Sequence, residues 1–76
     1  RANCFVAQVN WCLDVKDSTR ADVQIRYRHQ GVPATITKLE NSRVRVEFDQ
    51  PQISIAPGQS AVFYQDDCVI GGGWLE

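Results

Sequence analysis

The sequence predicts a small antiparallel β-barrel, an all-β fold of about six strands. The chain has 76 residues and is 43% hydrophobic, which suits one globular domain covering residues 1–76. Its apolar residues recur at every second position, the period of a strand, rather than at helical spacing. Turn signals separate these runs at intervals of about 8–12 residues, as in sandwiches and small barrels. Closure into a barrel would also remove exposed sheet edges.

The first two predicted strands cover residues 4–11 and 22–28. The first is a largely apolar run that ends in an aromatic residue. The second alternates strictly, and its apolar members share one face: Val23, Ile25 and Tyr27. Its polar members take the opposite face: Gln24, Arg26 and Arg28. We therefore expect the second strand to be buried on one side and solvated on the other.

The third and fourth predicted strands form a hairpin. Residues 34–39 are rich in β-branched side chains and follow Pro33, whose missing N–H does little harm at the start of a strand. Residues 43–48 alternate, which predicts that Val44 and Val46 face the core. Residues 40–42 give a connecting loop of ordinary length.

Two further strands are predicted after the apolar stretch at residues 53–56. Pro57-Gly58 has the signature of a type II turn and introduces a strand at 60–65. Asp66-Asp67 turns the chain into a strand at 68–70. Gly71-Gly72-Gly73 follows, and no helix comes after it whose N-terminus would hold a phosphate. We therefore interpret this glycine run as a site of close backbone approach at barrel closure.

The net charge of −1 hides an uneven distribution along the chain. Residues 20–46 carry six bases and two acids, a surplus of four positive charges. From residue 47 onward there are five acids and no base. This asymmetry is compatible with one basic face that would suit a phosphate backbone. The alternative is that the charges simply solvate the outer faces of strands, and the pattern alone favours it.

Several kinds of site find no support in the sequence. The three cysteines, Cys4, Cys12 and Cys68, form neither a disulfide framework nor a CxxC zinc motif. Cys4 and Cys68 lie in apolar runs, which predicts buried thiols. Pairing a cysteine with His29 for catalysis is a weak alternative. We predict no catalytic residue, no metal ligand and no cofactor in this chain.

Localisation and the acidic pair at Asp66-Asp67 can also be judged from the sequence. The two adjacent carboxylates fit a solvated turn better than a metal site. The chain has neither a signal-peptide pattern nor an apolar run long enough to span a membrane. Unpaired thiols favour a reducing compartment, so we expect a cytoplasmic protein without membrane association.

One basic and aromatic cluster, residues 26–30, ends the second predicted strand. Arginine can bind phosphates in a bidentate manner, and tyrosine can stack on a base or bond to a sugar. Residues at a strand end are also accessible to a partner. The competing interpretation places Tyr27 in the core and both arginines in water. The residues alone support the two equally.

At this point the sequence resembles the C-terminal domain of the bacterial tRNA-specific 2-thiouridylases, the MnmA family, over about residues 5–74. The resemblance rests on the order and spacing of several segments: Asn10-Trp11, Arg26-Tyr27-Arg28, Pro33, residues 46–51, residues 56–64 and Gly71-Gly72-Gly73. It implies a β-barrel that helps to hold tRNA, with the family's tRNA-contact positions on Arg26, Tyr27 and Gln59. The last hairpin departs from the family, with Asp66 where a glycine is common and Cys68-Val69-Ile70 in place of Val-Cys-Leu.

The resemblance also implies a larger parent, a tRNA-uridine 2-sulfurtransferase that makes 2-thiouridine at the wobble position. In that family ATP activates the uridine and a cysteine persulfide supplies sulfur, which requires a sulfur-donor protein. An N-terminal PP-loop domain and two catalytic cysteines lie upstream, and none of Cys4, Cys12 or Cys68 matches them. This C-terminal piece would therefore bind tRNA without being catalytic itself.

Two other functions are compatible with a barrel of this size. One is a structural or protein-docking module with no RNA contact, similar to the second-domain barrels of translation factors. The other is an independent enzyme, which the missing acid, base and nucleophile constellation disfavours.

Overall fold

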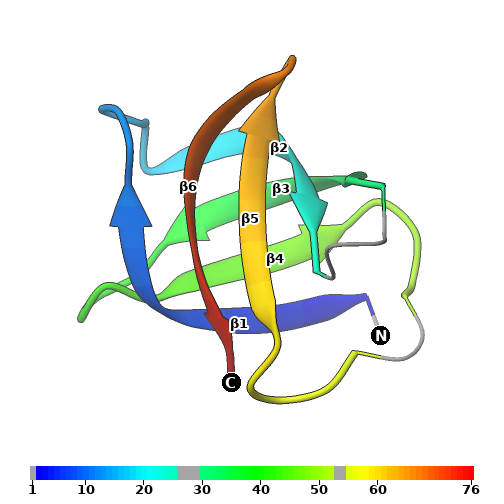
Figure 1. Ribbon diagram of the computed structural model, residues 1–76. Helices are drawn as coiled ribbons and strands as arrows, with labels where there is room; N and C mark the ends of the chain where they lie inside the picture. Colours follow the sequence, from blue (N-terminus) through cyan, green and yellow to red (C-terminus); the bar gives the residue numbers. More distant parts are fainter. Residues whose placement is uncertain (1, 26–29, 53–54) are drawn as a thin grey trace.

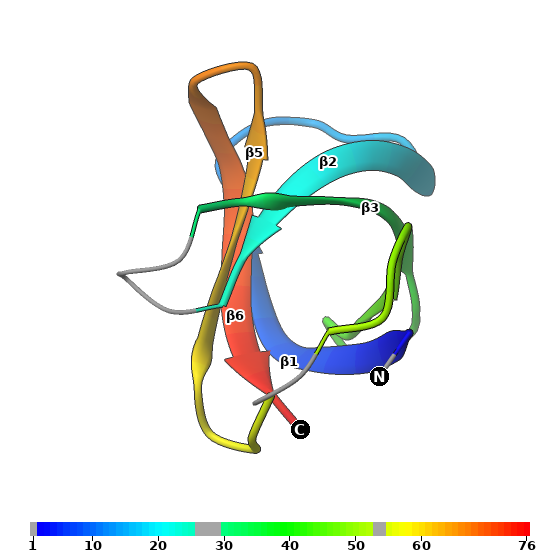
Figure 2. The ribbon, with the colours of Figure 1, turned by 90° about the vertical axis from the view of Figure 1, so that its right-hand side faces the viewer.

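The computed structural model describes residues 2–25, 30–52 and 55–76, and it contains six strands that close into an antiparallel barrel. The strands follow one another along the chain with no helix among the described residues. Their bounds are β1 (Asn3–Trp11), β2 (Ser18–Gln24), β3 (Val32–Lys38), β4 (Val44–Phe48), β5 (Ser60–Gln65) and β6 (Cys68–Leu75). Around the barrel the order is β1-β4-β3-β2-β5-β6, and β6 pairs back onto β1. The predicted fold class is confirmed (Figures 1 and 2).

The core is the inward-facing set of alternating side chains. Val44 and Val46 are almost fully buried, as the alternation in this run predicts. Phe63 is also inaccessible to solvent, and Trp11 packs on it with ring centroids 5.7 Å apart. Among the described residues, all sixteen buried hydrophobic side chains belong to one cluster. A single core in a chain this short leaves a small stability margin.

β1 closes the barrel by changing partner along its length. Its first part pairs with β4, and its later part pairs with β6. A register shift between Ala7 and Asn10 contains Gln8, whose φ is +54°. The extra residue reverses the alternation, so Val6 and Val9 both point inward. Such a bulge bends a strand, which lets β1 join the two halves of the sheet.

Several strand boundaries differ from the predicted ones, with large differences at β2 and β6. β2 begins at Ser18, four residues before the predicted start at Asp22, because it pairs with β3 from Ser18↔Thr37 onward. β6 continues through the glycine run to Leu75 instead of ending at Ile70. The predicted type II turn is confirmed, since Gly58 has a φ of +86°.

The glycine run is a site of close backbone approach, as interpreted from the sequence. A Cβ atom on Gly73 would lie 2.4 Å from the Ala7 carbonyl oxygen, and one on Gly72 would lie 2.6 Å from that of Ala61. A Cβ atom on Gly71 would lie 2.7 Å from the Trp11 ring. β6 therefore fits between β1 and β5 only without side chains at these positions.

Candidate nucleic-acid interface

Gln59 lies at the end of the Pro57-Gly58 turn, immediately before β5. Its side-chain oxygen Oε1 accepts a hydrogen bond from the Ala56 N–H at 2.9 Å, so the side chain folds back over its own turn. This contact uses the oxygen of the amide and leaves the Nε2 group as a donor. The side chain is partly exposed. Gln59 can therefore present an N–H donor at this edge while its oxygen stabilises the turn.

The turn is fixed to β6 by backbone hydrogen bonds. The Gly58 N–H donates to the Leu75 carbonyl, and the Leu75 N–H donates to the Gln59 carbonyl, both at 2.8 Å. Leu75 is buried and ends β6. The position of Gln59 is thus set by the strand that closes the barrel.

The other two predicted contact residues, Arg26 and Tyr27, lie outside the described residues, as does His29. The described residue nearest to them, Ile25, is buried, as the predicted alternation requires. Gln24, the last residue of β2, pairs with Val62, three residues after Gln59. The end of β2 and the Gln59 turn therefore lie toward the same end of the β2–β5 pair. The predicted contacts of Arg26 and Tyr27 remain predictions.

Three of the six bases in residues 20–46 are paired with acids from the later part of the chain. Arg20 donates two hydrogen bonds to the Asp49 carboxylate, at 2.7 and 2.5 Å. Arg43 makes the equivalent paired contact with Glu76, at 2.5 and 2.9 Å. The Arg45 Nη2 atom lies 2.8 Å from the Glu47 Oε1 atom. For these arginines the favoured interpretation, charges that solvate the outer faces of strands, fits better than a basic face, because each is paired with an acid.

These pairs also shift the protonation of their acids. The hydrogen bonds from Arg20, helped by its charge, lower the pKa of Asp49. Arg43 lowers the pKa of Glu76 in the same way, and desolvation opposes both shifts. The acids therefore stay ionised at lower pH than free carboxyls, and the pairs persist at neutral pH.

Lys38 also contacts neighbouring residues. Its Nζ donates to the Val15 carbonyl at 2.5 Å and lies 5.1 Å from the centre of the Trp11 ring. These contacts hold the loop between β1 and β2 over that end of the barrel. Lys38 thus has a structural role in this loop.

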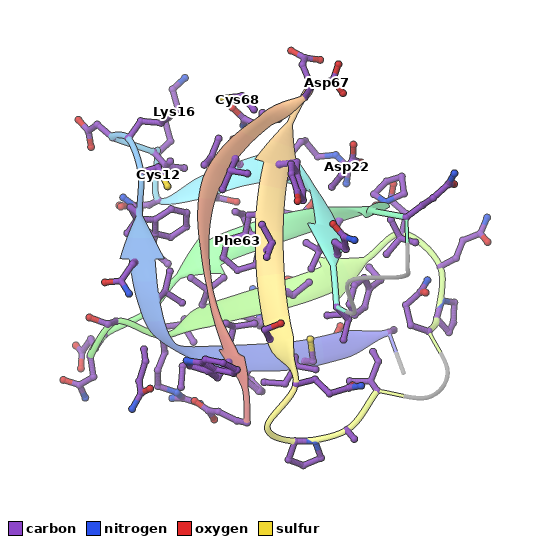
Figure 3. The ribbon with its side chains drawn as sticks, in the orientation of Figure 1. Cys12, Lys16, Asp22, Phe63, Asp67 and Cys68 are labelled. Carbon is purple, nitrogen blue, oxygen red and sulfur yellow. The ribbon has the colours of Figure 1, made fainter. Side chains whose placement is uncertain are left out.

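The acidic side of the molecule has a shallow hollow beside the β5–β6 hairpin. Its volume is about 260 Å³. Three of its six lining residues are acids: Asp22, Asp66 and Asp67. The other three are Gln24, Gly31 and Tyr64. A smaller hollow of about 200 Å³ adjoins it and shares Asp22, Tyr64 and Asp66. Figure 3 shows Asp67 at the tip of the hairpin. Carboxylates repel phosphate, so these three acids are themselves unsuited to contact with an RNA backbone.

The acidic turn and the cysteines can now be placed. Asp66 and Asp67 are exposed, as expected of a solvated turn. Among residues 2–25, 30–52 and 55–76, no group of three His, Cys, Asp or Glu side chains could hold a metal ion. Cys4 is buried as predicted, whereas the prediction for Cys68 is wrong. Cys68 is exposed because it begins β6 at the hairpin tip, toward the same end of the barrel as Cys12 (Figure 3).

The last two residues have structural roles that the sequence did not predict. Leu75 is buried and pairs with Val6, and Glu76 forms the ion pair with Arg43. The exposure of Trp74, at 52%, was also not foreseen. The alternation in β6 would have indicated it, had the strand been extended through the glycines. Among the described residues no helix is long and apolar enough to cross a bilayer.

The closed barrel, with Gln59 on a turn anchored to β6, defines a small all-β barrel module. A family model described as the aminomethyltransferase beta-barrel domain matches residues 1–75. The chain therefore belongs to this family of barrel domains.

Curated relatives extend the comparison. The chain is 56% identical over 75 residues to a tRNA-specific 2-thiouridylase MnmA of Trichormus variabilis and 53% identical over 75 residues to that of Nostoc punctiforme. These matches cover 96% of this chain and 21% of each relative. The equivalent protein of Vibrio parahaemolyticus is 43% identical over 74 residues, or 95% of this chain and 20% of the relative. The resemblance to the 2-thiouridylases is confirmed, and the chain spans about a fifth of the length of these relatives.

Proposed function

We propose that this chain is the tRNA-binding C-terminal module of a tRNA-uridine 2-sulfurtransferase that makes 2-thiouridine at the wobble position. The observation that carries the proposal is the match of nearly the whole chain to a fifth of each relative named as a tRNA-specific 2-thiouridylase. In this proposal the ATP-dependent activation and the sulfur transfer belong to upstream domains, including a PP-loop domain. The parent works in the cytoplasm with tRNA and a sulfur-donor protein as partners.

The proposed tRNA contacts are Arg26, Tyr27 and Gln59. The geometry at Gln59 supports this role, because its Nε2 group can donate to a sugar or a base edge while the backbone of its turn is anchored to β6. Because the described arginines are paired with acids, we expect specific contacts to contribute more than net charge.

The first test compares tRNA binding by full-length parent variants in filter-binding assays at several salt concentrations. Arg26→Ala and Gln59→Ala should each weaken binding by about 1–3 kcal/mol, the usual loss for one polar contact to nucleic acid. Arg26→Ala should also lower the salt slope by about one unit, since one phosphate contact is removed, while Gln59→Ala should not. ATP binding should be unchanged.

Matched controls separate contact from folding. Arg20→Ala removes an arginine from the same strand region, but one already paired with Asp49, so tRNA affinity should not change. Gln59→Glu keeps an oxygen for the Ala56 N–H and removes the donor. Gln65→Glu adds the same charge at the far end of β5 and controls for general repulsion.

The runner-up is a structural or protein-docking barrel without RNA contact, which the paired arginines and the acidic hollow favour. It predicts unchanged tRNA affinity in Arg26→Ala and Gln59→Ala while the parent remains folded. That result would overturn the tRNA-binding role.

A further inference from the structure

Two exposed aromatic side chains lie near each other on the outer face of β1 and β6. Phe5 is 37% exposed and Trp74 is 52% exposed. Trp74 pairs with Ala7, two residues from Phe5, and the alternation in both strands turns these side chains outward. The Glu76 N–H donates to the Phe5 carbonyl, which keeps the two strands together beyond Trp74. We call the outer surface formed by Phe5, Ala7 and Trp74 the aromatic face.

The surroundings of Trp74 leave its indole uncovered. Its cross-strand partners are Ala7 on β1 and Ser60 on β5, and Gly73 precedes it. These residues are too small to shield a large ring. Within the described part of the chain, neither another aromatic ring nor a cation stacks on this indole. Exposed aromatic area of this kind on an ordered strand is typical of a contact surface.

The charges beside the aromatic face are balanced. The Arg43 guanidinium lies 5.1 Å from the centre of the Phe5 ring and is paired with Glu76 across β1. Next to it, Arg45 is paired with Glu47. A phosphate backbone needs unpaired positive charge, whereas aromatic and arginine side chains in a neutral setting are typical of protein interfaces. The face is therefore suited to protein rather than RNA.

We propose that the aromatic face is where the remainder of the longer 2-thiouridylase polypeptide packs on this barrel. The proposal rests on the proposed function, in which the chain is one module of such an enzyme. About four fifths of each relative's length lies outside the match. β1 begins at Asn3, two residues before Phe5, so a polypeptide joined at this end reaches the face without crossing the barrel.

Docking on this face would also orient the proposed tRNA contact. Leu75, the neighbour of Trp74, makes two backbone hydrogen bonds with the Gly58–Gln59 turn. A partner held against Trp74 would thus be held at a fixed position relative to Gln59. The barrel would then hold Gln59 in one orientation relative to the upstream domains.

Hydroxyl-radical footprinting with mass spectrometry tests this proposal. Side-chain oxidation is compared between the 76-residue chain, the full-length enzyme, and the full-length enzyme with tRNA. Trp74 and Phe5 should become several-fold less reactive in the full-length enzyme without tRNA. Val69 and Leu13 are also exposed, at 41% and 47%. Val69 lies near the start of β6, at the opposite end from Trp74, and Leu13 follows the end of β1. They serve as internal controls and should keep their reactivity.

Each outcome separates the docking proposal from the function proposal. Trp74 equally reactive in the short and full-length proteins would overturn docking. Protection that appears only with tRNA would also overturn it and would assign the face to RNA. Protection without tRNA, together with normal tRNA affinity in Gln59→Ala, would support docking while refuting the tRNA contact.

A pair of substitutions gives a second measurement. Trp74→Ser should leave the melting temperature of the 76-residue chain nearly unchanged, since the side chain is exposed. In the full-length enzyme it should speed proteolytic release of the barrel several-fold, whereas the matched Val69→Ser variant should not. Equal release rates for both variants would contradict the proposal.

Discussion

The seam where β6 closes against β1 and the turn at residues 56–59 both depend on glycine, but for different reasons. At the seam there is no space, since a Cβ on Gly73 would lie 2.4 Å from the Ala7 carbonyl oxygen. At the turn there is space, with nothing within 4 Å of a Cβ on Gly58, and the requirement is a φ of +86°. The seam is therefore restricted by packing, whereas the turn is restricted only by backbone conformation. This leaves the turn free to carry a functional side chain such as Gln59.

Substitution by aspartate should lower the free energy of unfolding much more in the interior than on the outer surface. Val46 is fully buried, so Val46→Asp would place a charge in the core without a partner and should leave the domain unfolded, a loss of about 4–5 kcal/mol or more. Arg45→Asp, one residue away on the outer face, should change the free energy of unfolding by only about 0.5 kcal/mol. Thermal unfolding followed by circular dichroism measures both. Equal melting behaviour would mean that the assignment of faces in β4 is wrong.

The comparison of seam and turn is tested by alanine at the two glycines. Gly73→Ala should destabilise the barrel by about 3 kcal/mol or more, because β1 or β6 must move to admit the methyl group. Gly58→Ala should cost about 1–2 kcal/mol, the strain of a left-handed conformation in a residue with a Cβ. Urea denaturation of the two variants gives both values. A larger loss at Gly58 than at Gly73 would reverse the distinction between the two regions.

Much of the fold follows from alternation. The run that contains Val46 alternates apolar and polar side chains, whereas the runs that contain Val6 and Phe63 are largely apolar. All three form strands at nearly the predicted positions. The start of β2 was missed because Ser18, Thr19 and Arg20 are polar and have no apolar alternation to mark them. Their strand conformation comes from pairing with β3, which is a tertiary effect.

Less of the candidate site than of the fold could be predicted from local sequence patterns. Local pattern cannot show that Arg43 meets Glu76, since these residues are 33 positions apart and approach only when the barrel closes. Among the described residues, Arg20, Arg43 and Arg45 are each paired with an acid. Gln59 was identified by family resemblance, because a polar residue after a Pro-Gly turn has no distinctive spacing of its own.

The smallest expected effect concerns the ion pairs, one at the seam and one away from it. Arg43–Glu76 spans β1, and Arg20–Asp49 spans β3, where Arg20 also bonds to Thr35. In each pair, hydrogen bonding to arginine lowers the pKa of the acid below its ordinary value, 4.5 for Glu76 and 3.8 for Asp49. A lowered pKa in the folded state adds stability above the unfolded pKa, and this is lost as the pH falls through the folded value.

The melting temperature should therefore fall below about pH 5, as carboxyls that are paired only in the folded state take up protons. Glu76→Gln should make this fall slightly shallower and lower the melting temperature slightly at pH 7, and Asp49→Asn should do the same. Both acids are exposed, so salt should reduce both effects by screening. Thermal melts between pH 3 and pH 7, at low and high salt, give the measurement. If Glu76→Gln leaves the pH profile unchanged while Asp49→Asn alters it, the seam owes its stability to backbone packing alone, and the ion pair across β1 adds nothing to it.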